Sequence, residues 1–219
     1  MTQRHSRESH DDGALGRRLR EVLRSADRPS DALREQGIVA GIPEVAALAD
    51  TPQDPVWHPE GDVLVHSLWA ADLAARHAIA SSLAVDDRER LVLACLWHDI
   101  GKPSTTRRRE GRITSYGHAE RGAEIVRDLG MRLGLPGSLT RAVAALTATH
   151  MAHASVRGEP STRAVRRLAA RLQGAGASLG EWAVVVQCDG RARGAAARPD
   201  ASASWIRVAE GAGIPVRRA

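Results

Sequence analysis

Apolar residues recur at helical spacing along most of this chain. In residues 15–25, Leu15, Leu19, Val22 and Leu23 fall on one face, three or four residues apart. The same pattern, with capping residues and glycine or proline stops, predicts helices over 30–38, 62–80, 86–99, 117–134, 136–153, 161–172, 178–190 and 202–213. Segment 62–80 is apolar almost all round, which is typical of a buried helix. The predicted fold class is therefore all-α.

Strand signals are weak by comparison. The run GRITSYG at 111–117 fits a short extended piece in a loop, and the β-branched run at 183–186 lies within a helical period. A length of 219 residues indicates one domain. We expect a disordered polar tail over residues 1–12 and a single helical domain over 13–219, with a proline-rich but ordered segment before residue 62.

Composition limits where the protein works. No apolar run approaches the roughly 20 residues of a membrane span, so no membrane partner is expected. The polar N-terminus does not resemble a secretory signal, and two cysteines are too few for a disulfide framework. We therefore expect a cytoplasmic protein. Cys95 and Cys188 flank the residues of interest below, and we interpret them as small buried side chains rather than metal ligands.

The chain is basic, and its positive charge is almost entirely arginine. The net charge of +5 and the pI near 10.4 are compatible with a phosphate-bearing or nucleic-acid partner. Lys102 is the only lysine. An ammonium is a compact point charge, unlike the planar guanidinium. A single lysine in an arginine-rich chain therefore indicates that a point charge is required at this position.

Three short runs contain a set of potential metal ligands. They are HPEGDVLVHS with His66, LACLWHDIGKP with His98 and Asp99, and VVVQCDGRARG with Asp189. Imidazoles and carboxylates on such apolar helices are costly unless they are paired or bind an ion. Nitrogen and oxygen ligands of this kind suit a divalent metal, which can activate water. The sequence therefore predicts metal-assisted hydrolysis. These ligands discriminate poorly between Mn, Fe, Co, Ni and Mg.

Further residues are placed to join this site. Asp99 and Lys102 are three apart and share a face if the helix continues for a turn. We expect His118 and His150 to build a second metal site with a bridging Asp99, or to bind the phosphate. We expect His153 to be either a surface residue or a partner of a ligand residue, and His77 to have an ordinary packing role. The other polar residues of the HPEGD run stay ambiguous: His58 has no assigned role, and Glu60 and Asp62 fit helix caps slightly better than partners of ligand histidines.

Arginines cluster directly after Lys102. The loop PSTTRRREGR fits either a solvated face or contacts to a phosphate or RNA backbone. The arginine candidates for substrate binding are Arg107, Arg108, Arg121 and Arg191, with Arg109, Arg112 and Arg193 in similar positions. No interleaved aromatic platform for stacked bases is visible in the sequence.

At these motifs the chain resembles the HD phosphohydrolase superfamily. It is most similar to the HD domain of bacterial CCA-adding tRNA nucleotidyltransferases, over about residues 33–194, with the motif core at about 56–194. The resemblance implies an HD-type helical bundle and metal-dependent hydrolysis of phosphoesters, including phosphatase and 2′,3′-cyclic phosphodiesterase activities. It also implies that His118 and His150 hold a second ion. The nucleotidyltransferase half of those enzymes has no counterpart here, so CCA addition is not expected.

The resulting hypothesis is a phosphohydrolase that uses one or two divalent ions and a metal-bound hydroxide. Its expected substrate is a terminal or cyclic phosphate of an RNA 3′ end or a nucleotide. Asp99, Lys102 and His118 are the expected catalytic residues. Two alternatives stay open: a hydrolase of dNTPs or signalling nucleotides, and a non-catalytic RNA-binding or tRNA-binding module. The oligomeric state is also open.

Overall fold

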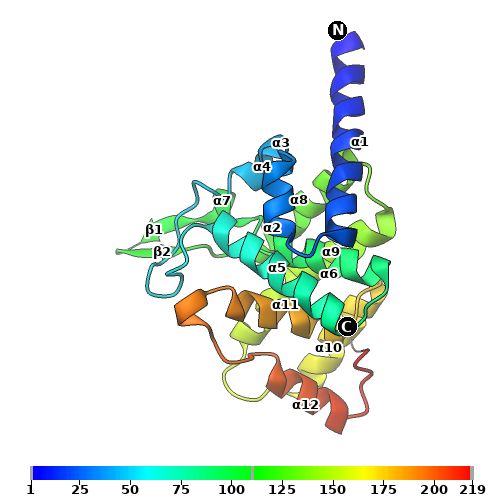
Figure 1. Ribbon diagram of the computed structural model, residues 1–219. Helices are drawn as coiled ribbons and strands as arrows, with labels where there is room; N and C mark the ends of the chain where they lie inside the picture. Colours follow the sequence, from blue (N-terminus) through cyan, green and yellow to red (C-terminus); the bar gives the residue numbers. More distant parts are fainter. Residues whose placement is uncertain (1, 110, 218–219) are drawn as a thin grey trace.

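The computed structural model describes residues 2–109 and 111–217, with side chains from residue 11 onward. It is a bundle of helices from which one small hairpin projects (Figure 1). The described elements are α1 (Thr2–Ser25), α2 (Pro29–Glu35), α3 (Ile38–Gly41), α4 (Pro43–Ala46), α5 (Val63–Ala80), α6 (Val85–Trp97), α7 (Lys102–Thr105), β1 (Arg107–Arg109), β2 (Arg112–Thr114), α8 (His118–Arg132), α9 (Gly137–Thr149), the 3₁₀-helix η1 (His150–Ser155), α10 (Thr162–Gly174), α11 (Leu179–Arg191), the 3₁₀-helix η2 (Gly194–Ala196) and α12 (Ala203–Gly211).

The predicted all-α class is confirmed. Each predicted helix has a counterpart, although 136–153 divides into α9 and a 3₁₀ turn at His150. The helix predicted over 86–99 was expected to begin with Asp86 as its cap, but Asp86 lies inside the first turn of α6, whose N-cap is Ala84. Helix α1 begins at Thr2, so the backbone of most of the predicted tail is helical in the structure. Disorder of residues 1–12 in solution stays a prediction.

Helices α5, α6, α8, α9 and α11 form the centre of the bundle. The closest pairs are α8 with α9 and α5 with α6, and α11 packs against α5. A Cβ at Gly130 would overlap Thr140, so the glycine allows α8 and α9 to approach closely. The core contains mainly leucine, valine and alanine with Trp97 and Trp182 fully buried. Its side chains pack into one cluster that extends from α1 to α12.

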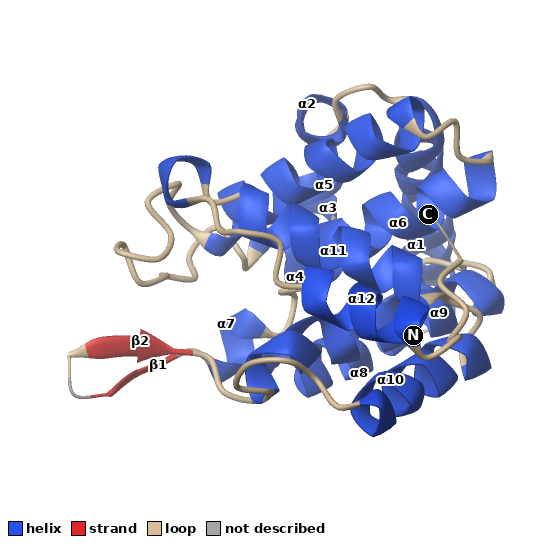
Figure 2. Ribbon diagram, turned by 90° about the horizontal axis from the view of Figure 1, so that it is seen from below, coloured by secondary structure: helices blue, strands red, loops and turns tan. Residues whose placement is uncertain are grey.

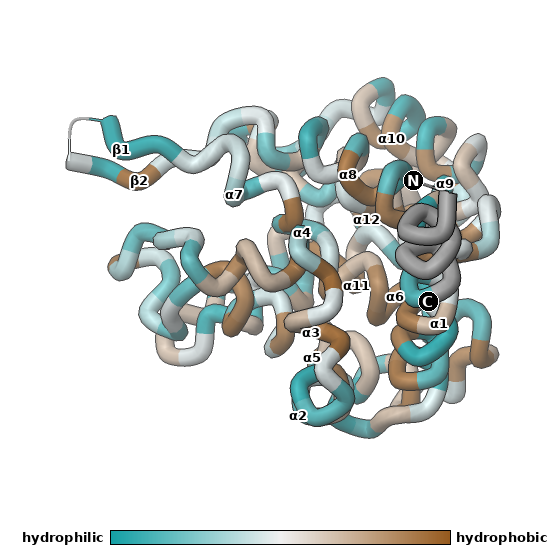
Figure 3. The backbone as a smooth tube through the Cα atoms, turned by 90° about the horizontal axis from the view of Figure 1, so that it is seen from above, coloured by the Kyte–Doolittle hydropathy of each residue, from teal (hydrophilic) through white to brown (hydrophobic). Residues whose placement is uncertain are grey.

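The strands β1 and β2 form a two-stranded antiparallel hairpin in which Arg109 pairs with Arg112. Gly111 adopts a positive φ of 77° in the turn, a conformation that favours glycine. The hairpin projects from the helical body (Figure 2). Its first strand is formed entirely by exposed arginines and is strongly hydrophilic (Figure 3). The sequence predicted an extended piece over β2 but gave no signal for β1. None of the described helices has the length and apolar character needed to cross a membrane.

Candidate metal centre

His98 and Asp99 lie at the C-terminal end of α6, where the chain turns sharply toward α8. Both side chains are buried. A Cβ at Gly101 would overlap the carbonyl oxygen of His118 and the amide nitrogen of Gly122. Only glycine therefore allows this turn to pack against the start of α8. The turn brings the first residue of α8, His118, next to Asp99.

The remaining predicted ligands come from three other helical elements. His66 lies in the first turn of α5, which begins at its N-cap Asp62. Asp189 lies in the last turn of α11, and His150 begins η1. All three side chains are buried. The structure thus brings together residues that are separated by up to 123 positions in the sequence.

Asp99 lies between two groups of histidines. Its Oδ2 atom is 3.2 Å from His98 Nε2 and 3.9 Å from His66 Nε2. Its Oδ1 atom is 3.3 Å from His118 Nε2 and 3.7 Å from His150 Nε2. Each carboxylate oxygen therefore faces a different pair of imidazoles, which is the arrangement expected of a carboxylate that bridges two cations.

Hydrogen bonds at Nδ1, the ring nitrogen that does not face Asp99, fix the orientation of three imidazole rings. The Nδ1 atoms of His98, His118 and His150 each lie 2.7 Å from a main-chain carbonyl oxygen, of Cys95, Ser115 and Thr147. A carbonyl only accepts, so each Nδ1 carries the proton and donates. In the neutral ring the Nε2 atom then presents a lone pair to the centre of the cluster. This tautomer is the one a metal ligand requires.

The Nε2 lone pairs of these histidines have few hydrogen-bond donors around them. This observation supports a bound cation. Buried His98 Nε2 has no hydrogen-bond partner although it lies 3.2 Å from Asp99. The Nε2 atoms of His118 and His150 face each other at 3.1 Å. Converging lone pairs and carboxylates repel each other in a buried site unless a positive charge lies between them. The donor set therefore fits a divalent metal.

Three groups of side chains have ligand atoms close enough to hold an ion, and two of these groups consist of predicted metal ligands alone. His66, His98 and Asp189 form one of the two, and Asp99, His118 and His150 form the other. The third group is His58, Glu60 and His66, in which Glu60 contacts both imidazoles. Within each group the ligand atoms lie within 4.8 Å of one another. Nitrogen and oxygen donors of this kind accept several divalent metals, so the identity of the ion is not determined by the ligands.

The charges at the site are set by these neighbours. Burial raises the pKa of Asp99, but Lys102 and His98 outweigh it and hold that pKa well below the usual value. For Asp189, burial also raises the pKa, and His66 and His98 lower it well below normal. Both carboxylates are thus ionised and available as ligands. Burial lowers the pKa of His66, yet Asp189 and Glu60 raise it to about 8.

The cluster lies in the wall of a cavity of about 920 Å³. The ligands Asp99, His118, His150 and Asp189 line it together with Lys102. The proline-rich segment contributes residues 52–54 and 57–58, and the hairpin and start of α8 contribute 113–120. This volume is near the upper end of the roughly 300–1,000 Å³ of small-molecule sites. The candidate ligands are therefore accessible to a molecule much larger than a phosphate ion.

Two carboxylates of the HPEGD run have different roles. Asp62 caps α5 by accepting a hydrogen bond from the amide of Val65 at 2.9 Å, as predicted. Our slight preference for a cap at Glu60 was wrong. Its Oε1 atom lies 2.7 Å from His66 Nδ1 and 2.9 Å from His58 Nδ1, so it orients the ligand His66. His58 lines the cavity, and burial and Lys102 lower its pKa to about 4.

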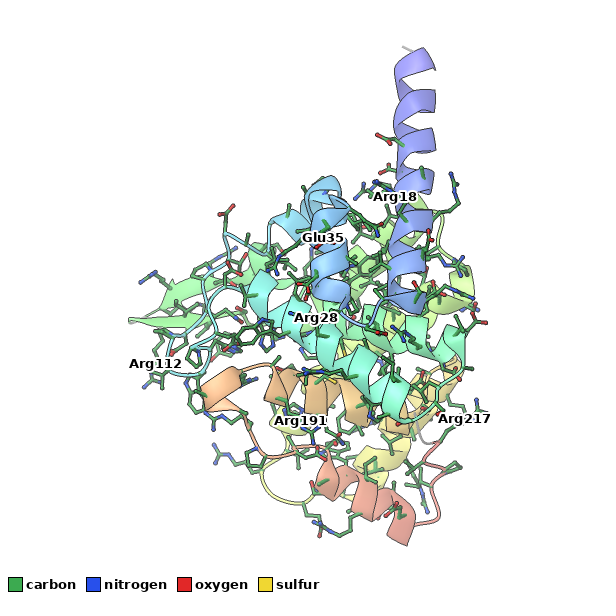
Figure 4. The ribbon with its side chains drawn as sticks, viewed as in Figure 1. Arg18, Arg28, Glu35, Arg112, Arg191 and Arg217 are labelled. Atoms are coloured by element: carbon green, nitrogen blue, oxygen red, sulfur yellow. The ribbon has the colours of Figure 1, made fainter. Side chains whose placement is uncertain are left out.

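The predicted substrate-binding arginines lie at the edges of the site. Arg107 and Arg108 are exposed on β1, Arg121 forms an exposed ion pair with Glu124, and Arg191 is exposed at the end of α11. None of them lines the cavity described above. In Figure 4, Arg112 lies on the hairpin side of the molecule and Arg191 beside α11.

Three other arginines line the cavity: Arg167, Arg171 and Arg193. Arg193 donates to Asp189 Oδ1 at 3.1 Å, which matches its place four residues after that ligand. Arg167 and Arg171 lie on α10 and were not singled out from the sequence. Their spacing of four residues was the available signal.

The two cysteines and the two remaining histidines near the site lie outside the predicted ligand groups. Cys95 and Cys188 are buried, free and outside both ligand groups, as expected. Burial and the neighbouring Cys188 raise the pKa of Cys95 well above normal. His153 is half-buried, and its Nδ1 atom lies 3.0 Å from the carbonyl of His150. His77 lies away from both ligand groups, on α5.

Comparison with known proteins finds curated relatives of this chain. The curated relatives include proteins named "Multifunctional CCA protein" from Halorhodospira halophila (36% identity over 137 residues), Acidovorax sp. (33% over 186 residues) and Verminephrobacter eiseniae (37% over 150 residues). The aligned regions cover 62%, 83% and 67% of this chain, but only 31%, 41% and 34% of those proteins. The chain thus spans less than half the length of these relatives.

A family model also matches the central part of the chain. Residues 63–175 match the HD domain, and this range contains His66, His98, Asp99, His118 and His150. The matched residues form the central helices and most of the ligand cluster. The chain therefore belongs to the HD domain family, a superfamily of metal-dependent phosphohydrolases.

Proposed function

We propose that this protein hydrolyses a terminal or cyclic phosphate of an RNA 3′ end or a nucleotide. The observation that carries the proposal is the convergence of imidazole lone pairs on two ionised carboxylates in the wall of an open cavity. His66, His98, Asp99 and Asp189 would hold the principal ion. His118 and His150 would hold a second ion through Asp99, or would contact the phosphate.

A divalent cation bound here would supply Lewis acidity and lower the pKa of water to a value useful at neutral pH. The protein supplies the orientation. Each of the two oxygens of Asp99 faces a different ligand pair, so this carboxylate can direct water toward the phosphorus. Lys102, which lies 2.7 Å from Asp99 Oδ2 and lines the cavity, would neutralise charge that develops on the phosphate.

The size of the cavity supports a nucleotide-sized substrate rather than a bare phosphate ester. The resemblance to the HD domain of CCA-adding tRNA nucleotidyltransferases, together with the relatives named CCA proteins, supports RNA as the source of that phosphate. In this proposal Arg107, Arg108, Arg121 and Arg191 contact the phosphate backbone that leads to the cavity. Because none of these arginines lines the cavity, such contacts require a substrate that extends beyond it. A cytoplasmic location stays a prediction.

The test is turnover of 2′,3′-cyclic AMP and p-nitrophenyl phosphate with Mn²⁺, Ni²⁺, Co²⁺ or Mg²⁺. Wild-type protein and a control, Asp128→Ala on the exposed face of α8, should hydrolyse at least one ester. Asp99→Ala should lose that activity and still fold. Equal rates in wild-type protein and Asp99→Ala with every metal would exclude the proposal. Salt-dependent RNA binding that survives loss of His98 and Asp99, without hydrolysis, would favour a binding module.

A further inference from the structure

Two arginines on α10 face the same cavity as the metal ligands. Arg167 and Arg171 line it together with their helix neighbours Ala164 and Leu168. These four positions follow the i, i+3, i+4, i+7 pattern of one helix face. Both guanidiniums are on an element that carries none of the predicted metal ligands.

Arg167 and Arg171 differ from the other cations of the cavity because their side chains have no anionic partner. Among the described residues that line it, the cations are Lys102, Arg193, Arg167 and Arg171. Lys102 is paired with Asp99 at 2.7 Å and Arg193 with Asp189 at 3.1 Å. No hydrogen bond or ion pair in the described part of the chain engages the side chain of Arg167 or Arg171. Two exposed guanidiniums one turn apart are thus available to bind an anion.

The wall between the two regions is largely apolar. The chain that follows His150 contributes Met151, Ala152 and Val156 to the cavity lining, together with one polar residue, Ser155. A ligand that extends along this wall would place an anionic group at the metal ligands, an uncharged portion against η1 and a second anionic group at the arginines. A phosphate–nucleoside–phosphate unit has this order of charges.

We propose that Arg167 and Arg171 form a second phosphate site, and that the preferred substrate carries a phosphate on the far side of the nucleoside from the one that is hydrolysed. This inference rests on the proposed function and specifies its substrate class. The second phosphate has two possible sources, the internal phosphodiester of an RNA end or the free phosphate of a nucleoside bisphosphate. They share the chemistry that the arginines recognise.

The test compares three probes by isothermal titration calorimetry with Ca²⁺: adenosine 3′-phosphate, adenosine 3′,5′-bisphosphate and the dinucleotide ApAp. Wild-type protein should bind at least one of the two-phosphate probes about tenfold more tightly than adenosine 3′-phosphate, as expected for charge-assisted hydrogen bonds. Arg167→Gln/Arg171→Gln should bind all three within about twofold. Tighter binding of ApAp than of the bisphosphate would assign the site to an RNA chain, and the reverse to a free nucleotide.

The matched control is Arg127→Gln/Arg166→Gln, which removes the same charge from exposed positions outside the cavity. It should keep the wild-type preference. Equal affinity of wild-type protein for all probes, no binding of any probe, or a preference that survives in the Arg167/Arg171 variant would each overturn the second phosphate site. If the protein hydrolyses a phosphate ester but does not prefer the two-phosphate probes, the second phosphate site is rejected and the proposed function stands. If the protein prefers the two-phosphate probes but hydrolyses no ester, the proposed function is rejected and the second phosphate site stands.

Discussion

Lys102 Nζ lies 2.7 Å from Asp99 Oδ2, the carboxylate oxygen that also faces His98 and His66. The same ammonium donates to Gln53 Oε1 at 2.8 Å and lines the cavity. The expected contact between Asp99 and Lys102 is present, but α6 ends at Trp97, so a turn rather than a continued helix brings the two side chains together. The only lysine of the chain lies where one point charge can interact with both a ligand carboxylate and an incoming phosphate.

Replacing this lysine should separate metal binding from catalysis. We expect Lys102→Met to lower kcat/KM for 2′,3′-cyclic AMP by about 100-fold, because one positive charge near the transferred phosphate is lost. Metal affinity should stay equal or rise, since a cation that competes for Asp99 Oδ2 is removed. Steady-state kinetics and metal titration measure the two effects. Lys102→Arg, which keeps the charge, should retain more activity, and a selective loss of metal binding in Lys102→Met would contradict this role.

Gly101 should be intolerant of any side chain. Gly101→Ala would push the turn after Asp99 away from the start of α8 and displace His118. We expect a loss of about 1–3 kcal/mol in the free energy of unfolding, measured with urea, together with weaker metal binding. Gly174→Ala is the control, since a Cβ there meets nothing within 4 Å at the end of α10. Equal stability of Gly101→Ala and wild-type protein would show that the turn is not tightly packed.

Metal binding should depend on pH through His66. Its pKa is raised to about 8, so the protein prepared without metal holds a proton on this ring at pH 7. An ion that binds Nε2 must displace that proton, so affinity should rise as pH increases toward about 8 and then level off. Calorimetry at pH 7 in buffers with different ionisation enthalpies should detect release of about one proton from His66. Binding without proton release would contradict protonation of His66.

Glu60 should act on the metal only through His66. Its Oε1 atom accepts from His66 Nδ1, so Glu60→Gln removes a charged acceptor that orients the ring. Such a change typically weakens metal affinity by about 10–100-fold, and we expect a loss in this range by equilibrium dialysis. Asp62→Asn is the control, because asparagine can still cap α5. Unchanged affinity in Glu60→Gln would assign the carboxylate a structural role.

The sequence predicted those parts of the molecule that depend on local pattern. Helical periodicity located the elements that carry His66 and Asp189, and the glycine and proline after Asp99 marked the end of α6. Contacts that depend on tertiary packing were not predictable in this way. Glu60 reaches His66 from an irregular segment, and Arg167 reaches the cavity because α10 packs against α9, α11 and α12. The arginine run of β1 has no strand pattern and becomes extended only by pairing with β2.

Anomalous diffraction from crystals soaked in Mn²⁺ tests most directly whether these side chains hold a cation. We expect an anomalous peak bounded by His66, His98, Asp99 and Asp189, and a second peak beside His118 and His150 if two ions bind. The same soak of Asp99→Ala crystals should lose or strongly weaken these peaks. Wild-type crystals that show no Mn²⁺ at the cluster at saturating concentration would contradict the metal centre and the hydrolytic function built on it.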